Sequence, residues 1–338
     1  MTHAEKPLAL TLGDPAGIGP DITLLAWSAK LATPVPPFVL LGDPGVLAER
    51  ARALGLAIRI EEIGDVAAAP SLFANALPVL PVSVASPVVA GRPDPANAGV
   101  VQQSIEQAVA LARSGAASAV VTNPISKATL TRAGFGFPGH TEFLAKLAGR
   151  ETSDAVMMLV GQDLKVVPVT IHIPLKEVMG ALTTERIVKT LEITARDCVR
   201  YFGLARPRIA VTGLNPHAGE DGTMGREEIE TIVPAIEAAR RQGLDVTGPY
   251  PADTLFHAEA RKSYDVAVAM YHDQALIPVK TLAFDTGVNV TLGLPFVRTS
   301  PDHGTAFALA GTGRASPRSL IEALHLAGTI RRNAETAP

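Results

Sequence analysis

The chain has 338 residues, enough for two domains or one large α/β domain. Apolar residues make up 47% of the composition and charged residues 19%, so we expect a packed core and no extensive disorder. The 30 basic and 33 acidic residues nearly balance and aromatic residues are only 4%, which argues against binding to nucleic acid or to an anionic membrane. Cys198, the single cysteine, excludes a disulfide framework and a zinc site of several thiolates. Together with an N-terminal apolar run (8–12) too short for a signal peptide, it predicts a cytoplasmic protein.

Short apolar runs rich in β-formers alternate with longer amphipathic runs, which predicts a mostly parallel sheet covered by helices. In chain order, we expect strands at residues 7–12, 38–41, 118–122, 155–160, 165–171, 208–212 and 265–270. We expect helices at residues 21–31, 46–54, 99–114, 141–147, 185–202, 227–241 and 319–331. Pro20 suits the opening turn of the first helix. The uncharged stretch 66–91 is long enough to span a membrane, but its four prolines exclude a spanning helix, so we expect loops and short strands there.

Three of the eight histidines share one sequence context. His172, His217 and His272 each lie just beyond an apolar run that we expect to be a buried strand. Ligands of open α/β sheets bind at the carboxyl ends of strands, and three imidazoles without thiolates suit a divalent metal ion with an open coordination position. The spacings of 45 and 55 residues exclude a zinc finger. The alternative is that each histidine only caps its strand or binds a backbone carbonyl.

Two glycine-rich segments have the composition of nucleotide-binding loops. Residues 134–139 match the pattern G-x-G-x-x-G, but we expect no strand before them, so we do not interpret the match as a dinucleotide fingerprint. Residues 13–20 (GDPAGIGP) do join a predicted strand to a predicted helix, where backbone amides can hold an anion. A tight glycine turn that only shapes the fold explains residues 13–20 equally well.

A second group of candidate residues is cationic and polar. Lys280, Asn289 and Arg298 lie in one C-terminal segment, and His140 and Thr141 lie near the start of a predicted helix. Such residues supply the charges and hydrogen-bond donors that a phosphorylated carboxylic acid needs. Scattered surface charges are the alternative explanation.

With these residues identified, the chain resembles the 4-hydroxythreonine-4-phosphate dehydrogenase family of vitamin B6 biosynthesis along nearly its whole length. The matching stretches are 13–20, 139–143 (GHTEF), 213–220 (GLNPHAGE), 251–256 (PADTLF), 271–274 (YHDQ), 287–295 (GVNVTLGLP), 298–300 (RTS) and 302–306 (DHGTA). Their number and length make the resemblance specific.

The resemblance implies a fold like that of isocitrate and isopropylmalate dehydrogenases, with two α/β/α domains and a cleft. It also implies a homodimer whose active site lies at the subunit interface. We expect residues 1–135 with 275–338 to form the first domain, on the NAD side, and residues 136–274 to form the second, on the metal and dimer side. The loop His303, Gly304 and Thr305 resembles the adenosine-side loop of that wider fold, which binds NAD without a G-x-G-x-x-G fingerprint.

The resemblance further implies that His172, His217 and His272 bind a divalent metal ion. Zinc, magnesium, cobalt and manganese all stay open as its identity. The same resemblance implies that the substrate is bound by His140, Thr141, Lys280, Asn289 and Arg298. Lys280, Asp253 and Asp273 are candidates for proton transfer, although Asp273 could equally support the metal site through His272.

The implied reaction is the NAD-dependent oxidation of 4-phosphooxy-L-threonine. Its product, a 2-amino-3-oxo acid, decarboxylates to 3-amino-2-oxopropyl phosphate on the route to pyridoxal 5'-phosphate. A dehydrogenase of 4-phospho-D-threonate or 4-phospho-D-erythronate is the main alternative, since it would keep the metal, phosphate and NAD sites. A metal-dependent hydrolase and a non-catalytic sugar-phosphate binding protein are more distant alternatives.

Overall fold

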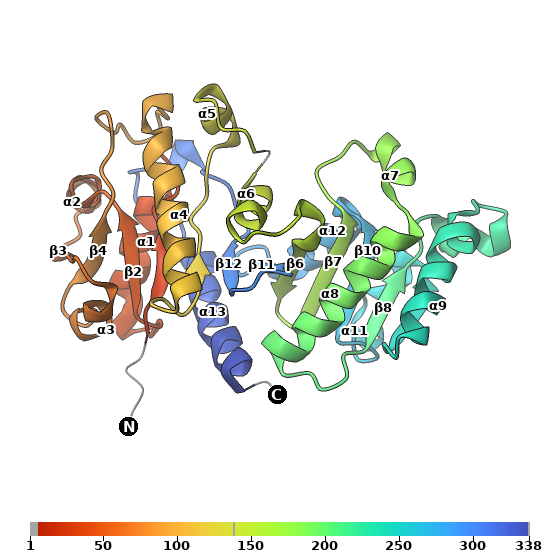
Figure 1. Cartoon of the computed structure of the whole chain (residues 1–338). Coiled ribbons are helices and arrows are strands. Elements are labelled where there is room, and N and C mark those ends of the chain that lie inside the picture. The colour runs from red at the N-terminus through yellow and green to blue at the C-terminus, as the bar shows by residue number, and fades with distance from the viewer. Residues whose placement is uncertain (1–5, 138, 337–338) are drawn as a thin grey trace. The chain divides into compact units, whose positions relative to one another are not determined.

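The structure is a computed structural model of the chain and describes residues 6–137 and 139–336. The chain forms two compact units (Figure 1). The first unit runs to Thr152 and resumes over Leu294–Arg331, and the second comprises Ser153–Gly293 and the residues from Arg332 on. These limits fall later along the chain than the domain limits that we expected after residues 135 and 274.

Two packing contacts account for the later limits. Phe143, on helix α6 (His140–Leu147), packs against Phe135 and Phe137 with ring centroids 5.0 and 5.1 Å away, so this segment stays with the first unit. Helix α12 (His272–Ala283) packs on strands of the second unit, and it keeps the residues after 274 with them.

The first unit is built on parallel strands in the order β3-β4-β2-β1-β5-β12. The strands are β1 (Leu8–Thr11), β2 (Phe38–Gly42), β3 (Ile60–Glu62), β4 (Leu77–Pro81), β5 (Val120–Val121) and β12 (Arg298–Pro301). Its helices are α1 (Gly19–Ser28), α2 (Pro44–Ala53), α3 (Ala69–Leu72), α4 (Ala98–Ser114), α5 (Lys127–Arg132), α6 and α13 (Arg318–Thr336), the last of which ends in the second unit. Every residue of β1 and β2 is buried, as expected for strands covered on both faces.

The second unit has the strand order β11-β6-β7-β10-β8-β9. The strands are β6 (Val156–Gly161), β7 (Leu164–Thr170), β8 (Ile209–Thr212), β9 (Val246–Tyr250), β10 (Val266–Tyr271) and β11 (Val288–Leu292). Strands β7, β10, β8 and β9 are parallel, whereas β6 pairs antiparallel with both β7 and β11. The helices are α7 (Leu175–Ala181), α8 (Thr184–Phe202), α9 (Val233–Arg241), α10 (Ala252–Leu255), α11 (Ala258–Arg261) and α12.

Helices cover both faces of this second sheet. In Figure 1, α8 lies in front of β7 and β10, and α12 lies behind them. The buried side of α12 includes Leu276 and Val279, which join one apolar cluster with residues of β6, β7 and β10. Gly161 lets α12 approach closely, because a Cβ there would lie 2.6 Å from the Cβ of Ala283.

The predicted α/β class and mostly parallel pairing are confirmed, as is Pro20 in the first turn of α1. The region predicted as a helix over 227–241 instead begins with a π-helical turn, Glu228–Ile232, before α9. Sequence analysis assigned no element to β3, β9, β11, β12, α5, α7, α10, α11 or α12. The stretch 66–91, expected as loops and short strands, contains helix α3 as well as strand β4. Of the helices in the described part of the chain, none combines the length and the apolar content that a membrane crossing needs.

Candidate functional site

The three candidate histidines follow three neighbouring strands of the second unit. His172 lies two residues beyond β7, His272 directly follows β10, and His217 lies in the loop after β8. These strands are adjacent in the order β7-β10-β8 and run parallel. Because parallel strands end at the same edge of a sheet, the sequence context shared by the histidines brings them to one edge, as predicted.

His172 and His272 lie side by side. Their ring centroids are 5.6 Å apart, and both residues line a cavity of about 350 Å³ with Tyr271 and Asp273. The carboxylate of Asp273 accepts a hydrogen bond from Nδ1 of His272 at 2.7 Å. This bond fixes the tautomer of His272 and leaves Nε2 as the nitrogen able to bind a metal ion.

The backbone at two of these histidines is strained. His172 has φ +52° and His217 has φ +51°, in the left-handed region that residues other than glycine rarely adopt. His217 opens a run of five left-handed residues, 217–221. Strained backbone of this kind clusters at functional sites, because the surrounding structure must hold it in place.

Imidazole and carboxylate donors suit a divalent metal ion, but the described residues of one chain do not bring three such groups together. Among residues 6–137 and 139–336, no three histidine, cysteine, aspartate or glutamate side chains lie close enough together to hold a metal ion. His172 and His272 supply two paired imidazoles with a carboxylate behind one of them, a combination typical of metal sites. His217 is exposed at the same edge and is the remaining imidazole of the predicted set.

Gln274 connects two of the histidine-bearing loops, a role that sequence analysis missed. Its Oε1 accepts hydrogen bonds from Thr212 Oγ1 and from the backbone N–H of Met270, both at 2.7 Å. Its Nε2 donates to the carbonyl oxygen of Gly213 at 2.8 Å. The amide therefore ties the end of β8 to the end of β10. The matching stretch 271–274 contained this residue, but nothing in the sequence indicated its partners.

The three candidates for proton transfer have different surroundings. Asp253, on α10, and Asp273 line a second cavity of about 430 Å³. Lys280 is half-buried on α12, seven residues after Asp273 and therefore on the same helix face two turns on. Its Nζ lies 6.0 Å from the ring centroid of Phe284.

The predicted substrate residues divide between the two units. Lys280 and Asn289, which is half-buried on β11, belong to the second unit, whereas Arg298 belongs to the first. Burial lowers the pKa of the Arg298 guanidinium to about 10, so it remains charged at neutral pH. Arg298 donates to Oγ1 of buried Thr122 at 2.6 Å.

His140 belongs to the same cluster of the first unit. It is the first residue of α6, followed by Thr141. Its Nε2 is buried and has no hydrogen-bond partner among the residues that the structure describes. Burial, together with the positive charges of Arg298 and Lys127, holds the pKa of His140 well below its usual value. A neutral imidazole beside a buried cation can donate to or accept from an anionic ligand without repelling the cation.

The loop of residues 13–20 and the loop after β12 contact each other. The backbone N–H of Ile18 donates to the carbonyl oxygen of Thr305 at 3.0 Å, and a Cβ on Gly17 would lie 3.0 Å from that same oxygen. Nearby, the Nδ1 of His303 lies 3.1 Å from the carbonyl oxygen of Gly304. The two segments predicted as a phosphate turn and an NAD loop thus form one feature at the carboxyl ends of β1 and β12.

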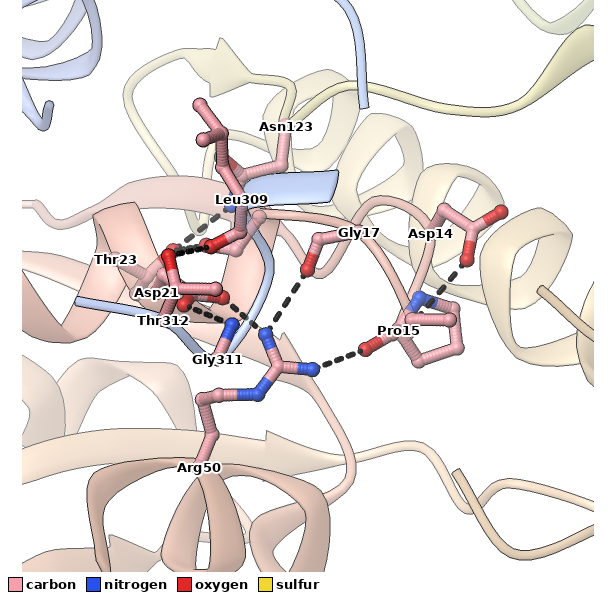
Figure 2. A network of polar contacts seen from close by, with 12 residues as sticks. Asp14, Pro15, Gly17, Asp21, Thr23, Arg50, Asn123, Leu309, Gly311 and Thr312 are labelled. Atoms are coloured by element: carbon pink, nitrogen blue, oxygen red, sulfur yellow. Dashed lines mark hydrogen bonds and ion pairs between the residues drawn. The ribbon is translucent and has the colours of Figure 1, made fainter. Parts of the chain in front are cut away.

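The amides of residues 13–20 are largely occupied within the chain. Those of Asp14, Ala16, Gly17 and Ile18 donate to Pro124 O, Asp14 Oδ1, Asp14 O and Thr305 O. Arg50 stabilises the turn by donating hydrogen bonds to the carbonyl oxygens of Gly17 and Pro15, at 3.0 and 3.1 Å (Figure 2). This arrangement favours a turn that shapes the fold over an anion-binding loop.

The other glycine-rich match has no strand before it. Residues 134–137 and 139 lie between α5 and α6, and Pro138 is outside the described residues. The G-x-G-x-x-G pattern follows a helix, so its rejection as a dinucleotide fingerprint is confirmed.

Residues 34–327 match the family described as "Pyridoxal phosphate biosynthetic protein PdxA". The chain belongs to the PdxA family. A relative from Methylorubrum populi named 4-hydroxythreonine-4-phosphate dehydrogenase is 58% identical over 97% of this chain and 95% of its own length. The crystal structure of a protein of that name from Klebsiella pneumoniae has a TM-score of 0.87 and 39% identity, and the match covers 96% of this chain and 99% of the other.

A more distant structure extends the likeness of fold. A β-decarboxylating dehydrogenase from Thermococcus kodakarensis has a TM-score of 0.50 at 14% identity, covering 98% of this chain and 84% of its own. The PdxA family chain therefore shares its α/β fold with that enzyme, and at this identity the likeness concerns the fold alone.

Proposed function

We propose that this member of the PdxA family catalyses the NAD-dependent oxidation of 4-phosphooxy-L-threonine in vitamin B6 biosynthesis. The resulting 2-amino-3-oxo acid decarboxylates to 3-amino-2-oxopropyl phosphate. The observation that carries the proposal is the placement of His172, His217 and His272 after three adjacent parallel strands. The proposed substrate comes from the names of relatives that match nearly the full chain, which are called 4-hydroxythreonine-4-phosphate dehydrogenase.

In this proposal, His172, His217 and His272 hold one divalent metal ion. Zinc, cobalt, manganese and magnesium are the candidates. When bound, such an ion acts as a Lewis acid that acidifies the substrate hydroxyl and polarises the carbonyl that replaces it. Asp273 orients His272 through the hydrogen bond to Nδ1, which supports it as a residue behind the metal site.

Cationic side chains and hydrogen-bond donors bind the anionic groups of the substrate. Arg298 is buried and close enough to the half-buried His140 for its charge to act on the imidazole, and with Thr141, the second residue of α6, these side chains suit a phosphate or carboxylate. Lys280 and Asn289 are the further substrate residues, from the second unit. His303, Gly304 and Thr305 bind the adenosine side of NAD, supported by the contact between Thr305 and the turn before α1.

The oxidation step requires one proton transfer and one hydride transfer. A base on the protein takes the hydroxyl proton while the hydride on the same carbon passes to NAD. The bond to the carboxylate of the β-keto acid then breaks, carbon dioxide leaves, and the electron pair of that bond forms an enolate. The enolate carbon takes up a proton to give the ketone product. Asp253 and Lys280 are our candidates for the base, and Asp253 is supported by the cavity that it shares with Asp273.

We also propose that the active enzyme is a cytoplasmic homodimer with residues of both subunits in each site. Large apolar side chains are exposed on α7 and α12, two helices that contribute residues to the histidine cavity, which supports an interface there. Leu175 and Met179 on α7 are 69% and 59% exposed, and Ile277 on α12 is 64% exposed. A second subunit at this edge would also add ligands to the close pair of imidazoles that the described residues of one chain supply.

An absorbance assay for NADH tests the function. We expect NADH to form with 4-phosphooxy-L-threonine, to stop on chelation, and to resume when a divalent metal ion is restored. 4-Phospho-D-threonate and 4-phospho-D-erythronate are the comparison substrates. If either of these compounds is turned over faster, it is the better candidate for the substrate. Full activity in a preparation shown to be metal-free would refute the proposed metal dependence.

Mixed dimers test the shared site. Two inactive variants, for example His172→Ala and His272→Ala, are combined under conditions in which tagged subunits are shown to exchange. If the changed residues come from opposite subunits, one site of each mixed dimer is intact, and about a quarter of all sites recover. Pairings among His140, His172, His217, His272 and Lys280 are tried in turn, and no recovery in any of them means that each site is built from one chain.

A further inference from the structure

The turn that carries His217 has an unusual backbone. Residues 217–221 all have positive φ, between +42° and +84°, and only Gly219 among them is a glycine. L-residues resist this conformation because the Cβ comes too close to the following carbonyl oxygen. A run of such residues persists only where surrounding contacts enforce it, so some group outside the run must hold it.

The carboxylate of Glu228 is placed to do this. Glu228 is 3% exposed and begins the π-helical turn Glu228–Ile232. Its Oε1 accepts hydrogen bonds from the successive backbone N–H groups of Leu214 and Asn215, at 2.7 and 2.8 Å. Its Oε2 accepts a further one from Nδ2 of Asn215 at 3.0 Å. One buried side chain thus holds the backbone immediately before the turn.

Glycines let the left-handed run close around this carboxylate. A Cβ on Gly219 would lie 2.5 Å from Oε2 of Glu228, and one on Gly213 would lie 3.1 Å from Oε1. The same added Cβ on Gly213 would lie 2.8 Å from Cα of Ala218. The turn and the carboxylate therefore pack closely together. The same Nδ2 of Asn215 that donates to Glu228 also donates to Oε2 of Glu227, at 2.7 Å.

We infer that Glu228 is a positioning residue for metal binding: it holds the left-handed turn so that His217 is presented at the sheet edge that carries His172 and His272. This inference rests on the proposed role of His217 as a metal ligand. Glu228 acts through the backbone of the turn and is not itself a ligand. Removing an outer partner of a metal ligand typically weakens metal binding by about 10- to 100-fold.

The test is a titration of the full-length protein with Co²⁺ alone, followed by the visible absorbance of the bound ion. Glu228→Gln keeps the size of the side chain but puts an amide donor where Oε2 accepts from Asn215. We expect the Kd for Co²⁺ to rise by about 10- to 100-fold. Glu230→Gln is the matched control, since Glu230 lies in the same turn of helix but is exposed and pairs with Arg226. We expect its Kd to match that of the unchanged protein.

A His217→Ala background separates positioning from a general loss of structure. If Glu228 acts through His217, then Glu228→Gln causes no further loss of Co²⁺ affinity once His217 is replaced. An equal loss in both backgrounds, or wild-type affinity in Glu228→Gln, overturns the inference. If His217→Ala alone leaves the affinity unchanged, the proposed metal role of His217 fails instead. Should Glu228→Gln not fold, Asn215→Ala, which removes the donor to Oε2, takes its place in the same cycle.

Discussion

The stability of the first unit should depend on a buried ion pair, Arg50–Asp21, next to the turn of residues 13–18. Arg50 is 5% exposed and pairs with Asp21, which is fully buried and also accepts a hydrogen bond from the backbone N–H of Gly311 at 2.7 Å. Arg50→Ala leaves the Asp21 carboxylate buried without its cation and removes the donors to Pro15 and Gly17. Breaking a buried pair from one side costs about 3–5 kcal/mol of unfolding free energy.

That loss converts into a lower melting temperature. For a domain of this size about 2–4 °C is lost per kcal/mol, so we expect a decrease of roughly 6–20 °C in scanning calorimetry. Arg52→Ala is the control, because Arg52 lies on the same helix but is exposed. In the double variant Arg50→Ala/Asp21→Ala, the loss should be smaller than the sum of the single losses, since the two side chains are in direct contact. A loss for Arg50→Ala no greater than that for Arg52→Ala would refute this reasoning.

Three further predictions concern the site residues. Arg298→Gln should lower kcat/KM for the phosphorylated substrate at least tenfold, because a charge-assisted pair contributes about 1.5–3 kcal/mol; unchanged steady-state kinetics would place Arg298 outside the site. The lowered pKa of His140 keeps its imidazole neutral in the folded protein, while the unfolded chain takes up a proton below about pH 6.5. His140 therefore contributes stability that is lost as the pH falls, and denaturant titrations should show a steeper loss from pH 7 to pH 5 for the unchanged protein than for His140→Gln. Gln274→Ala leaves the backbone N–H of Met270 and the carbonyl of Gly213 without their side-chain partner, so metal affinity measured by Co²⁺ titration should fall, whereas Gln242→Ala, at an exposed helix end, should not change it.

Local patterns predicted most of the helices and strands correctly, and the errors have physical causes. Strand β12, which was not predicted, has only four residues and is stabilised by its neighbours rather than by its own sequence. Helix α12 contains Pro278 and starts directly at the end of β10, so no polar segment separates the two elements in the sequence. The segment predicted as one helix over 227–241 instead has a π-helical turn at Glu228–Ile232, and Glu228 accepts hydrogen bonds from the loop before His217, a long-range contact that local periodicity does not predict.

By itself, the sequence determined the family, the α/β class and the position of each candidate histidine beyond a buried strand, because all of these are written in local runs of residues. Only the tertiary structure decided that β7, β10 and β8 are neighbours and that His172 and His272 form a close pair. The tertiary structure likewise decided that the amides of Asp14, Ala16, Gly17 and Ile18 are bonded within the chain. It also decided the partners of Gln274 and Glu228, whose hydrogen bonds join segments far from them in the sequence. Strand order and long-range hydrogen bonds depend on how helices and sheets pack together, and no local pattern of side chains encodes that packing.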